Sequence, residues 1–207
     1  MKILTLDFKN QTLDFETLQS GRLVVIPKTE GVEVPEEKKH LFRAVEVQIT
    51  GENPDNHHGA KRFLAGSGDM LVYKNFEEER KGEKTEYIFT LENNLVEVKL
   101  HYEVYDGIDV LRGYTEIKNI NDSDIGLDYL SSLALTGLDL GIEGSKIEKI
   151  KVGTFYNTWC KELNYKENTL SELGFLPGGF GRIAVSSSGT WSTKEHLAQG
   201  FLMNNDG

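Results

Sequence analysis

Apolar and polar residues alternate with a period of two along much of the 207-residue sequence, most clearly in Leu95–Tyr105. Successive side chains of a β-strand point to opposite faces, so this alternation predicts a half-buried strand. Asp106-Gly107 follows, and such a pair accepts the positive φ angles of a two-residue hairpin turn, so a second strand is expected from Ile108. The two faces of the first strand consist of apolar Val96, Val98, Leu100, Tyr102 and Val104 and of polar Glu97, Lys99, His101 and Glu103.

Short runs of the same kind recur along the chain between Gly, Asn and Asp turns. Such a series predicts an all-β fold, a large antiparallel sandwich. Thr169–Glu172 has the spacing of a capping box and Gly174 follows as a stop signal, so a short helix is expected there. The charged run Glu77–Lys84 is interpreted as the solvated end of a hairpin. Further strands are expected at Ile3–Asp7, Arg22–Ile26, Arg43–Thr50, Met70–Lys74, Glu86–Leu91, Leu127–Thr136, Ile147–Val152, Arg182–Ser186 and Gly200–Met203.

The composition limits the partners of the chain. Lys plus Arg number 23 and Asp plus Glu number 33, which gives a net charge of −10. This balance argues against nucleic acid and against anionic membranes, whereas a neutral sugar is compatible with it. Cys160 is the only cysteine, and no apolar run has the length of a signal peptide core or a transmembrane helix. We therefore expect a soluble, cytoplasmic protein with neither a nucleic-acid nor a membrane partner.

Polar groups of several kinds gather in Gly51–Lys61, which is rich in turn formers and contains Asp55, His57, His58 and Lys61. A loop of this kind can present hydrogen-bond donors and acceptors to a ligand or to a facing domain. A solvated surface turn is the alternative interpretation. Adjacent histidines of a strand point apart and no further ligand spacing completes a coordination shell, so we expect no metal and no cofactor.

Two other segments could carry chemistry. Thr154–Tyr165 contains Phe155, Tyr156, Trp159 and Tyr165. Flat rings of this kind suit a sugar, a core or a domain interface, and core or interface is the preferred interpretation. Cys160 is interpreted as a small buried or half-buried residue. Ser186–His196 lacks the Gly-x-Ser-x-Gly pattern of a nucleophile elbow, so turn and capping hydrogen bonds explain its hydroxyls better. We assign no catalytic residue.

Several segments, in this order, resemble the N-terminal domain of glycoside hydrolase family 36, the α-galactosidases. They are Gly51-Glu-Asn-x-Asp-x-His-His-Gly-Ala-Lys61, Asn119-Ile-Asn121 before Ser131-Ser132, Trp159-x-x-Glu162 with Leu170-Ser-Glu-Leu-Gly174, and Gly189-Thr-Trp-Ser-Thr-Lys-Glu195. The resemblance implies a galactose-mutarotase-like β-supersandwich with one or two short helices. In that family a (β/α)₈ barrel follows and carries both catalytic aspartates, the nucleophile in a Trp-Asp motif. Here Trp159 precedes Cys and Trp191 precedes Ser, so that motif is absent.

The resemblance further implies a single non-catalytic domain over 1–207, inactive alone and truncated before the barrel. Gly200–Met203 followed by a turn without a return strand agrees with a truncation. The parent would be a retaining α-galactosidase or α-N-acetylgalactosaminidase. This domain would pack on the barrel, form homo-oligomers and contribute Asp55, His57, His58 and Lys61 to the rim of a pocket that binds an α-galactoside. A stand-alone carbohydrate-binding module and a mutarotase-like epimerase, which needs a His and a carboxylate in a concave pocket, are the alternatives.

Overall fold

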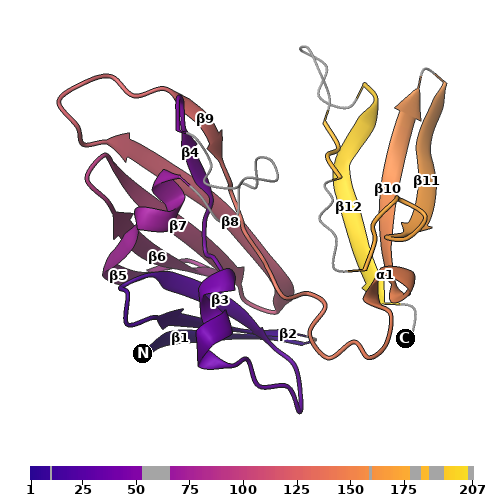
Figure 1. Ribbon diagram of the computed structural model, residues 1–207, viewed down its shortest axis with the longest axis horizontal. Coiled ribbons are helices and arrows are strands. Elements are labelled where there is room, and N and C mark those ends of the chain that lie inside the picture. Colours follow the sequence, from indigo (N-terminus) through magenta and orange to yellow (C-terminus); the bar gives the residue numbers. More distant parts are fainter. Residues whose placement is uncertain (10, 53–65, 159, 178–182, 187–193, 205–207) are drawn as a thin grey trace. The chain divides into compact units, whose positions relative to one another are not determined.

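The computed structural model describes residues 1–9, 11–52, 66–158, 160–177, 183–186 and 194–204 (Figure 1). The chain divides into two compact units, Met1–Leu140 and Gly141–Gly207. Both are built from antiparallel sheets, which confirms the all-β fold class. No helix in the described residues is long and apolar enough to cross a bilayer. The organisation as one domain over 1–207 stays a prediction.

The first unit contains two main sheets. One has three antiparallel strands, and the other is a four-stranded meander in which each strand pairs with the next. Gly82 and Gly107 adopt φ angles of 65° and 68° in the two hairpin turns of the meander that were expected from sequence. A short pair, β4 (Val47–Ile49) with β9 (Leu127–Leu130), completes the unit. The main strands are β1 (Lys2–Phe8), β2 (Gln11–Thr17), β3 (Leu23–Lys28), β5 (Val72–Lys81), β6 (Lys84–Glu92), β7 (Val96–Tyr105) and β8 (Ile108–Asn119).

The two main sheets face each other across one hydrophobic core. Phe15 of β2 stacks on Phe89 of β6 with ring centroids 5.0 Å apart, and Tyr102 of β7 meets the Phe15 ring edge-on at 4.9 Å. Phe15 and Phe89 are fully buried. The face of β7 expected to be apolar points into this core, from Val96 through Tyr102. The sandwich predicted from period-two alternation is therefore confirmed for the first unit.

Short helical turns connect some of the strands. They are the 3₁₀ turns η1 (Glu36–Leu41) and η3 (Ser67–Met70) and the helical turn α1 (Lys146–Lys149). The helix expected at Thr169 does not form, although its capping box does. The backbone N–H of Thr169 donates to Glu172 Oε2 at 2.8 Å, and the N–H of Glu172 donates to Thr169 Oγ1 at 3.1 Å. Gly174, at φ 86°, ends the segment after a single turn.

The second unit is a three-stranded antiparallel sheet in the order β11-β10-β12. Its strands are β10 (Ile150–Thr158), β11 (Lys161–Thr169) and β12 (His196–Asn204). The expected strand at Ile147–Val152 begins only at Ile150, because α1 occupies the preceding residues. The expected strand at Arg182–Ser186 is wrong for residues 183–186, which form no strand. Short apolar runs such as this one do not by themselves specify a ladder partner.

Candidate functional site

The predicted substrate-binding residues Asp55, His57, His58 and Lys61 all lie in 53–65, outside the described residues. The structure describes the base of this loop instead. Glu52 Oε2 accepts hydrogen bonds from the backbone N–H groups of Ile49 at 2.9 Å and Ser67 at 3.0 Å, and the Ser67 hydroxyl donates to Glu52 Oε1. One carboxylate therefore joins the residues on both sides of the loop.

We call the set of hydrogen bonds from Ile49 and Ser67 to the Glu52 carboxylate the Glu52 bridge. It depends on an ionised carboxylate at Glu52 and on a glycine at position 66. Burial would raise the pKa of Glu52, but the hydrogen bonds from the Ser67 hydroxyl and the two backbone N–H groups outweigh it and lower the pKa. Gly66 has a φ angle of 79°, and a Cβ at that position would lie 2.8 Å from Glu52 Oε2. Both features hold the two ends of the loop at one place on the first unit.

A second group of polar residues lies on the face of the β5–β8 sheet that points away from the core. We call it the carboxylate cluster, and it centres on Glu86 of β6 and Glu103 of β7, which are register partners. Each of the two glutamates is only 2% exposed, and His101 is 7% exposed. Each carboxylate needs compensation for lost hydration and for the repulsion from its neighbour. The compensating side chains are Lys81, Lys84, His101, Tyr105, Arg112 and Tyr114.

Three side chains surround Glu86. Lys81 Nζ donates at 2.5 Å, the Tyr114 hydroxyl donates at 2.6 Å, and His101 Nδ1 lies 2.8 Å from Glu86 Oε1. The Lys81 hydrogen bond, followed by that of Tyr114, lowers the pKa of Glu86 to about 2. The imidazole of His101 stacks on Tyr114 with a centroid distance of 4.3 Å, which fixes the plane of the ring. Its Nε2 makes no hydrogen bond and lies 3.7 Å from Glu116 Oε1.

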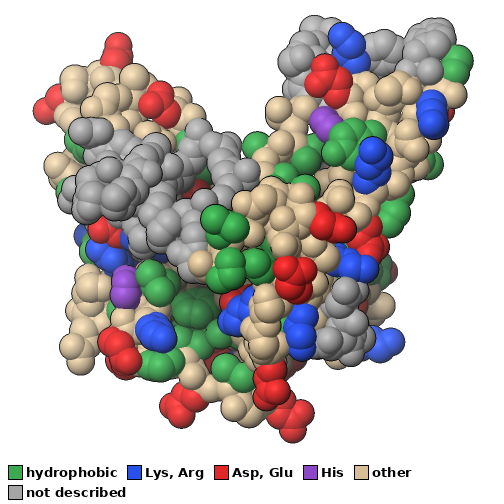
Figure 2. Space-filling model, turned by 45° about the vertical axis from the view of Figure 1, so that its right-hand side comes forward, with side chains coloured by type: hydrophobic (Ala, Val, Ile, Leu, Met, Phe, Trp, Pro, Cys, Tyr) green, Lys and Arg blue, Asp and Glu red, His purple; other side chains and the backbone are tan. Residues whose placement is uncertain are grey.

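Three other side chains compensate Glu103 for its lost hydration, and each of them donates a hydrogen bond to its carboxylate. Lys84 Nζ donates to Oε1, while the Tyr105 hydroxyl and Arg112 donate to Oε2 at 2.7 Å and 2.9 Å. The Lys84 hydrogen bond lowers the pKa of Glu103 most, with Tyr105 next, to about 2. Both buried glutamates are therefore ionised at neutral pH. On the face shown in Figure 2, acidic and basic side chains are interspersed over the surface.

The carboxylate cluster lacks the protonated carboxylic acid that a glycosidase needs. A retaining glycosidase uses one carboxylate as nucleophile and one protonated carboxylic acid. Neither Glu86 nor Glu103 holds a proton at neutral pH, and every carboxylate oxygen of the pair already accepts a hydrogen bond. The sequence pattern placed His101 and Glu103 on the polar face of the strand but gave no sign of their burial. The missed signal is the cross-strand register, which aligns Glu86 with Glu103 and His101 with Tyr114.

The aromatic segment of the second unit does not form a core in the described residues. Tyr156 is 40% exposed and contacts the His196 ring at 4.8 Å, whereas Tyr165 is 43% exposed and contacts Phe155 at 5.2 Å. Cys160 is exposed, contrary to the expectation of burial, and its φ angle of 61° places it in the turn between β10 and β11. Trp159 and most of the Ser-rich segment lie outside the described residues.

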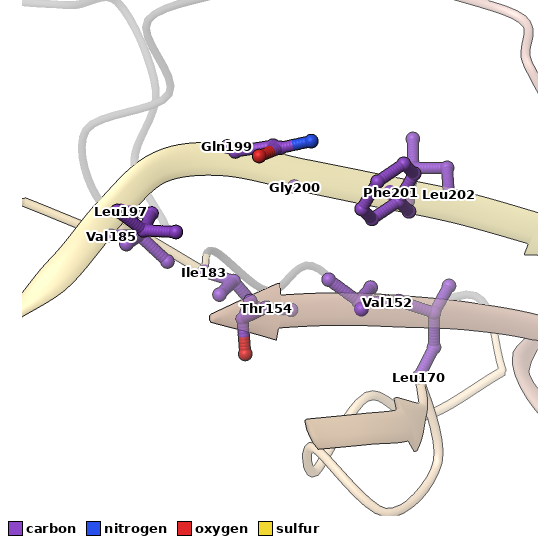
Figure 3. A pocket seen from close by; sticks show the side chains of 11 residues that line it. Val152, Thr154, Leu170, Ile183, Val185, Leu197, Gln199, Gly200, Phe201 and Leu202 are labelled. Carbon is purple, nitrogen blue, oxygen red and sulfur yellow. The ribbon is translucent and has the colours of Figure 1, made fainter. Parts of the chain in front are cut away.

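An apolar groove with a volume of about 620 Å³ lies on the second unit. Figure 3 shows the side chains that line it, from β10, β12, the segment 183–186 and Leu170, which directly follows β11. The apolar lining is formed by Val152, Leu170, Ile183, Val185, Leu197, Phe201 and Leu202, with Thr154 and Gln199 as polar members. Such a lining suits the burial of apolar surface. Within the described part of the chain, no three His, Cys, Asp or Glu side chains gather as metal ligands would.

The fold places the chain in the class of antiparallel β-sandwich proteins. No protein-family model matches the sequence, and no curated protein matches it either. The alpha-galactosidase from Lactobacillus brevis has a similar structure, with a TM-score of 0.52 and 12% identity, over 81% of this chain and 27% of that chain. The GH36 alpha-galactosidase AgaA from Geobacillus stearothermophilus gives a TM-score of 0.47 and 12% identity, over 81% and 28%. The chain thus spans about a quarter of the length of these enzymes. At 12% identity, the similarity to the Lactobacillus brevis enzyme shows the fold alone.

Proposed function

We propose that this chain is a non-catalytic N-terminal β-domain of a retaining α-galactosidase-like glycoside hydrolase. One observation carries the proposal: the fold covers 81% of this chain but only 27% of an alpha-galactosidase from Lactobacillus brevis. The fold by itself does not assign a catalytic role, and nearly three quarters of that enzyme lie outside the matched part. The substrate of the parent, an α-galactoside, belongs to this proposal.

The carboxylate cluster supports a non-catalytic role. Burial alone raises the pKa of a carboxyl group, and this is how a glycosidase obtains its general acid near neutral pH. In the cluster, Lys81 and Lys84 reverse that effect, so that Glu86 and Glu103 have pKa values of about 2. The absence of a Trp-Asp motif at Trp159 and Trp191 points the same way.

The proposed roles of the domain are packing on the catalytic barrel, homo-oligomerisation and a contribution to the active-site rim. The apolar groove supports packing, because an apolar lining gains free energy when another surface removes it from water. The Glu52 bridge supports the rim role, because it holds Ile49 and Ser67 together on the two sides of the segment that contains Asp55, His57, His58 and Lys61. A cytoplasmic location is part of the same proposal.

The test compares two proteins on one substrate. The purified 207-residue chain and the protein encoded by the whole reading frame are each incubated with an aryl α-galactoside. We expect hydrolysis by the longer protein and none by the chain alone. Turnover by the chain that survives repurification would overturn the non-catalytic role. A reading frame that ends after Gly207 would favour a stand-alone module.

The epimerase alternative requires a His and a carboxylate that face a common pocket. His101 and Glu86 are hydrogen-bonded, but both are buried and neither lines the apolar groove. Glu86 is also ionised and fully engaged by Lys81 and Tyr114. The same chain can be assayed by the rate at which freshly dissolved α-galactose changes its optical rotation, and we expect the rate in buffer alone.

A further inference from the structure

One face of the second unit carries three aromatic rings in contact, which we call the aromatic face. Phe155 of the central strand β10 lies between Tyr165 of β11 and Phe201 of β12, with centroid distances of 5.2 Å and 5.7 Å. Tyr165 and Phe201 are 43% and 42% exposed. Two large exposed rings on the outer strands thus flank the half-buried Phe155 ring of the central strand, and such contiguous apolar surfaces mark binding sites more often than isolated exposed residues do.

Gly153 determines how the Tyr165 ring lies. A Cβ at position 153 would be 2.7 Å from the Tyr165 hydroxyl oxygen and 2.8 Å from its Cε2. The hydroxyl end of the ring therefore occupies the space above the glycine, and the ring lies along the sheet instead of standing away from it. One part of the ring therefore covers Gly153, while Tyr165 as a whole stays 43% exposed. The absence of a side chain at 153 thus produces a flat aromatic platform.

Polar groups of both kinds border this platform. The Tyr165 hydroxyl donates to Glu167 Oε2 at 3.0 Å, and Lys151 Nζ lies 2.6 Å from Glu167 Oε1. Lys151 and Glu167 neutralise each other, so the border offers an acceptor and a donor without a net charge. Met203 is also adjacent, with its sulfur 3.8 Å from the Tyr165 hydroxyl.

We propose that the aromatic face binds the pyranose ring of a neutral saccharide. The C–H bonds on one side of such a ring are slightly positive and favour the negative face of an aromatic ring. Hydroxyl groups both donate and accept, which matches the pair of Lys151 and Glu167. A charged ligand would find no uncompensated opposite charge at this border, and the net charge of −10 disfavours an anion. The choice of a galactoside as the saccharide rests on the proposed function.

Methionine methyl signals give a direct test in the intact chain. The sequence contains only Met1, Met70 and Met203, so methyl-labelled methionine gives three NMR signals. Raffinose, a neutral trisaccharide with an α-galactosyl group, is titrated to tens of millimolar, with maltotriose as a galactose-free comparison. We expect a saturable shift of the Met203 signal. Met70 is exposed and belongs to the first unit, so its signal should stay in place.

Three variants locate the binding. Tyr165→Ala removes the platform and should weaken binding at least about tenfold. Tyr165→Phe keeps the ring and loses only the hydrogen bond to Glu167, so a loss of a few-fold is expected. Tyr156→Ala is the matched control, because Tyr156 is equally exposed but contacts His196 rather than Phe155, and its affinity should equal that of the unmodified chain.

Each other outcome overturns a defined part of the argument. If the chain is folded and the Met203 signal shows no saturable shift, the proposal is overturned. It is also overturned if the Tyr165→Ala variant still binds raffinose with unchanged affinity while the Met70 reference signal stays in place. A Met203 shift caused by the remainder of the parent protein, without any shift from saccharide, would make the aromatic face a domain interface instead. If raffinose shifts the Met203 signal but the whole protein does not hydrolyse α-galactosides, saccharide binding by the aromatic face is supported and the proposed function fails. If the whole protein hydrolyses α-galactosides but raffinose does not shift the Met203 signal, the proposed function stands and saccharide binding by the aromatic face fails.

Discussion

Acidification should unfold the first unit through the carboxylate cluster. The pKa values of Glu86 and Glu103 fall from the ordinary 4.5 to about 2 in the folded chain. A depressed pKa stabilises the folded state at pH values above the unfolded pKa, and this contribution is lost as the pH falls through the folded pKa. The window for this loss therefore runs from about pH 5 down to about pH 2.

The magnitude follows from the two shifts. A change from 4.5 to about 2 corresponds to about 3 kcal/mol for each carboxylate. The side chains of Lys81 and Arg112 are 50% and 59% exposed, so water screens their attraction and the contribution is smaller. We expect about 1–2 kcal/mol for each glutamate, or about 2–4 kcal/mol for the pair.

The assay is urea unfolding followed by circular dichroism at a series of pH values. Tryptophan fluorescence would report on the wrong part of the chain, because both tryptophans belong to Gly141–Gly207. The Glu86→Gln/Glu103→Gln variant should be less stable than the unmodified chain at about pH 7 and nearly equal to it at about pH 2. Glu78→Gln, at an exposed position of β5, is the control and should not change the pH dependence. Parallel curves for the double variant and the unmodified chain would refute the assigned role of the cluster.

Three further predictions concern the core, the loop base and the loop. Phe89→Ala should lower the free energy of unfolding by about 3–5 kcal/mol in urea, since the ring is fully buried against Phe15; a loss under about 1 kcal/mol would contradict the core assignment. Gly66→Ala should lower the Tm in a thermal scan, because its φ of 79° and the proximity of Glu52 Oε2 disfavour a Cβ. His58→Ala in the full-length protein should reduce kcat/KM on an aryl α-galactoside at unchanged Tm, and unchanged kinetics would exclude His58 from the rim.

The sequence predicts those strands whose pattern is local. Strand β7 and the turn at Asp106-Gly107 follow from period-two alternation and from the φ preference of one glycine, and both occur as expected. Strand β11 was not predicted, because Lys161–Thr169 is mostly polar and exposed, and its ladder with β10 forms without an apolar face of its own. The single turn at Thr169 shows the converse, since a capping box provides hydrogen bonds for a helix start but does not extend the helix.

The two candidate sites also differ in how far a local sequence pattern predicts them. The segment with Asp55, His57, His58 and Lys61 is predicted from its polar, turn-rich composition and from the family resemblance, and its role stays a prediction. The carboxylate cluster could not be predicted, because the burial of Glu86 depends on which residues of β5, β7 and β8 align beside it. Register is a property of paired strands and a one-residue slip would reverse every face.

The state of the buried glutamates also bears on where hydrolysis would take place. A carboxylic acid that donates a proton near neutral pH needs burial without a neighbouring cation. Glu86 and Glu103 have the opposite surroundings, since Lys81 and Lys84 contact them directly and hold both pKa values at about 2. The cluster would have to lose these lysines before either glutamate could act as an acid. If the chain belongs to a retaining α-galactosidase, as proposed, the general acid of that enzyme is therefore neither Glu86 nor Glu103, which is the consequence that the activity assay on the chain alone examines.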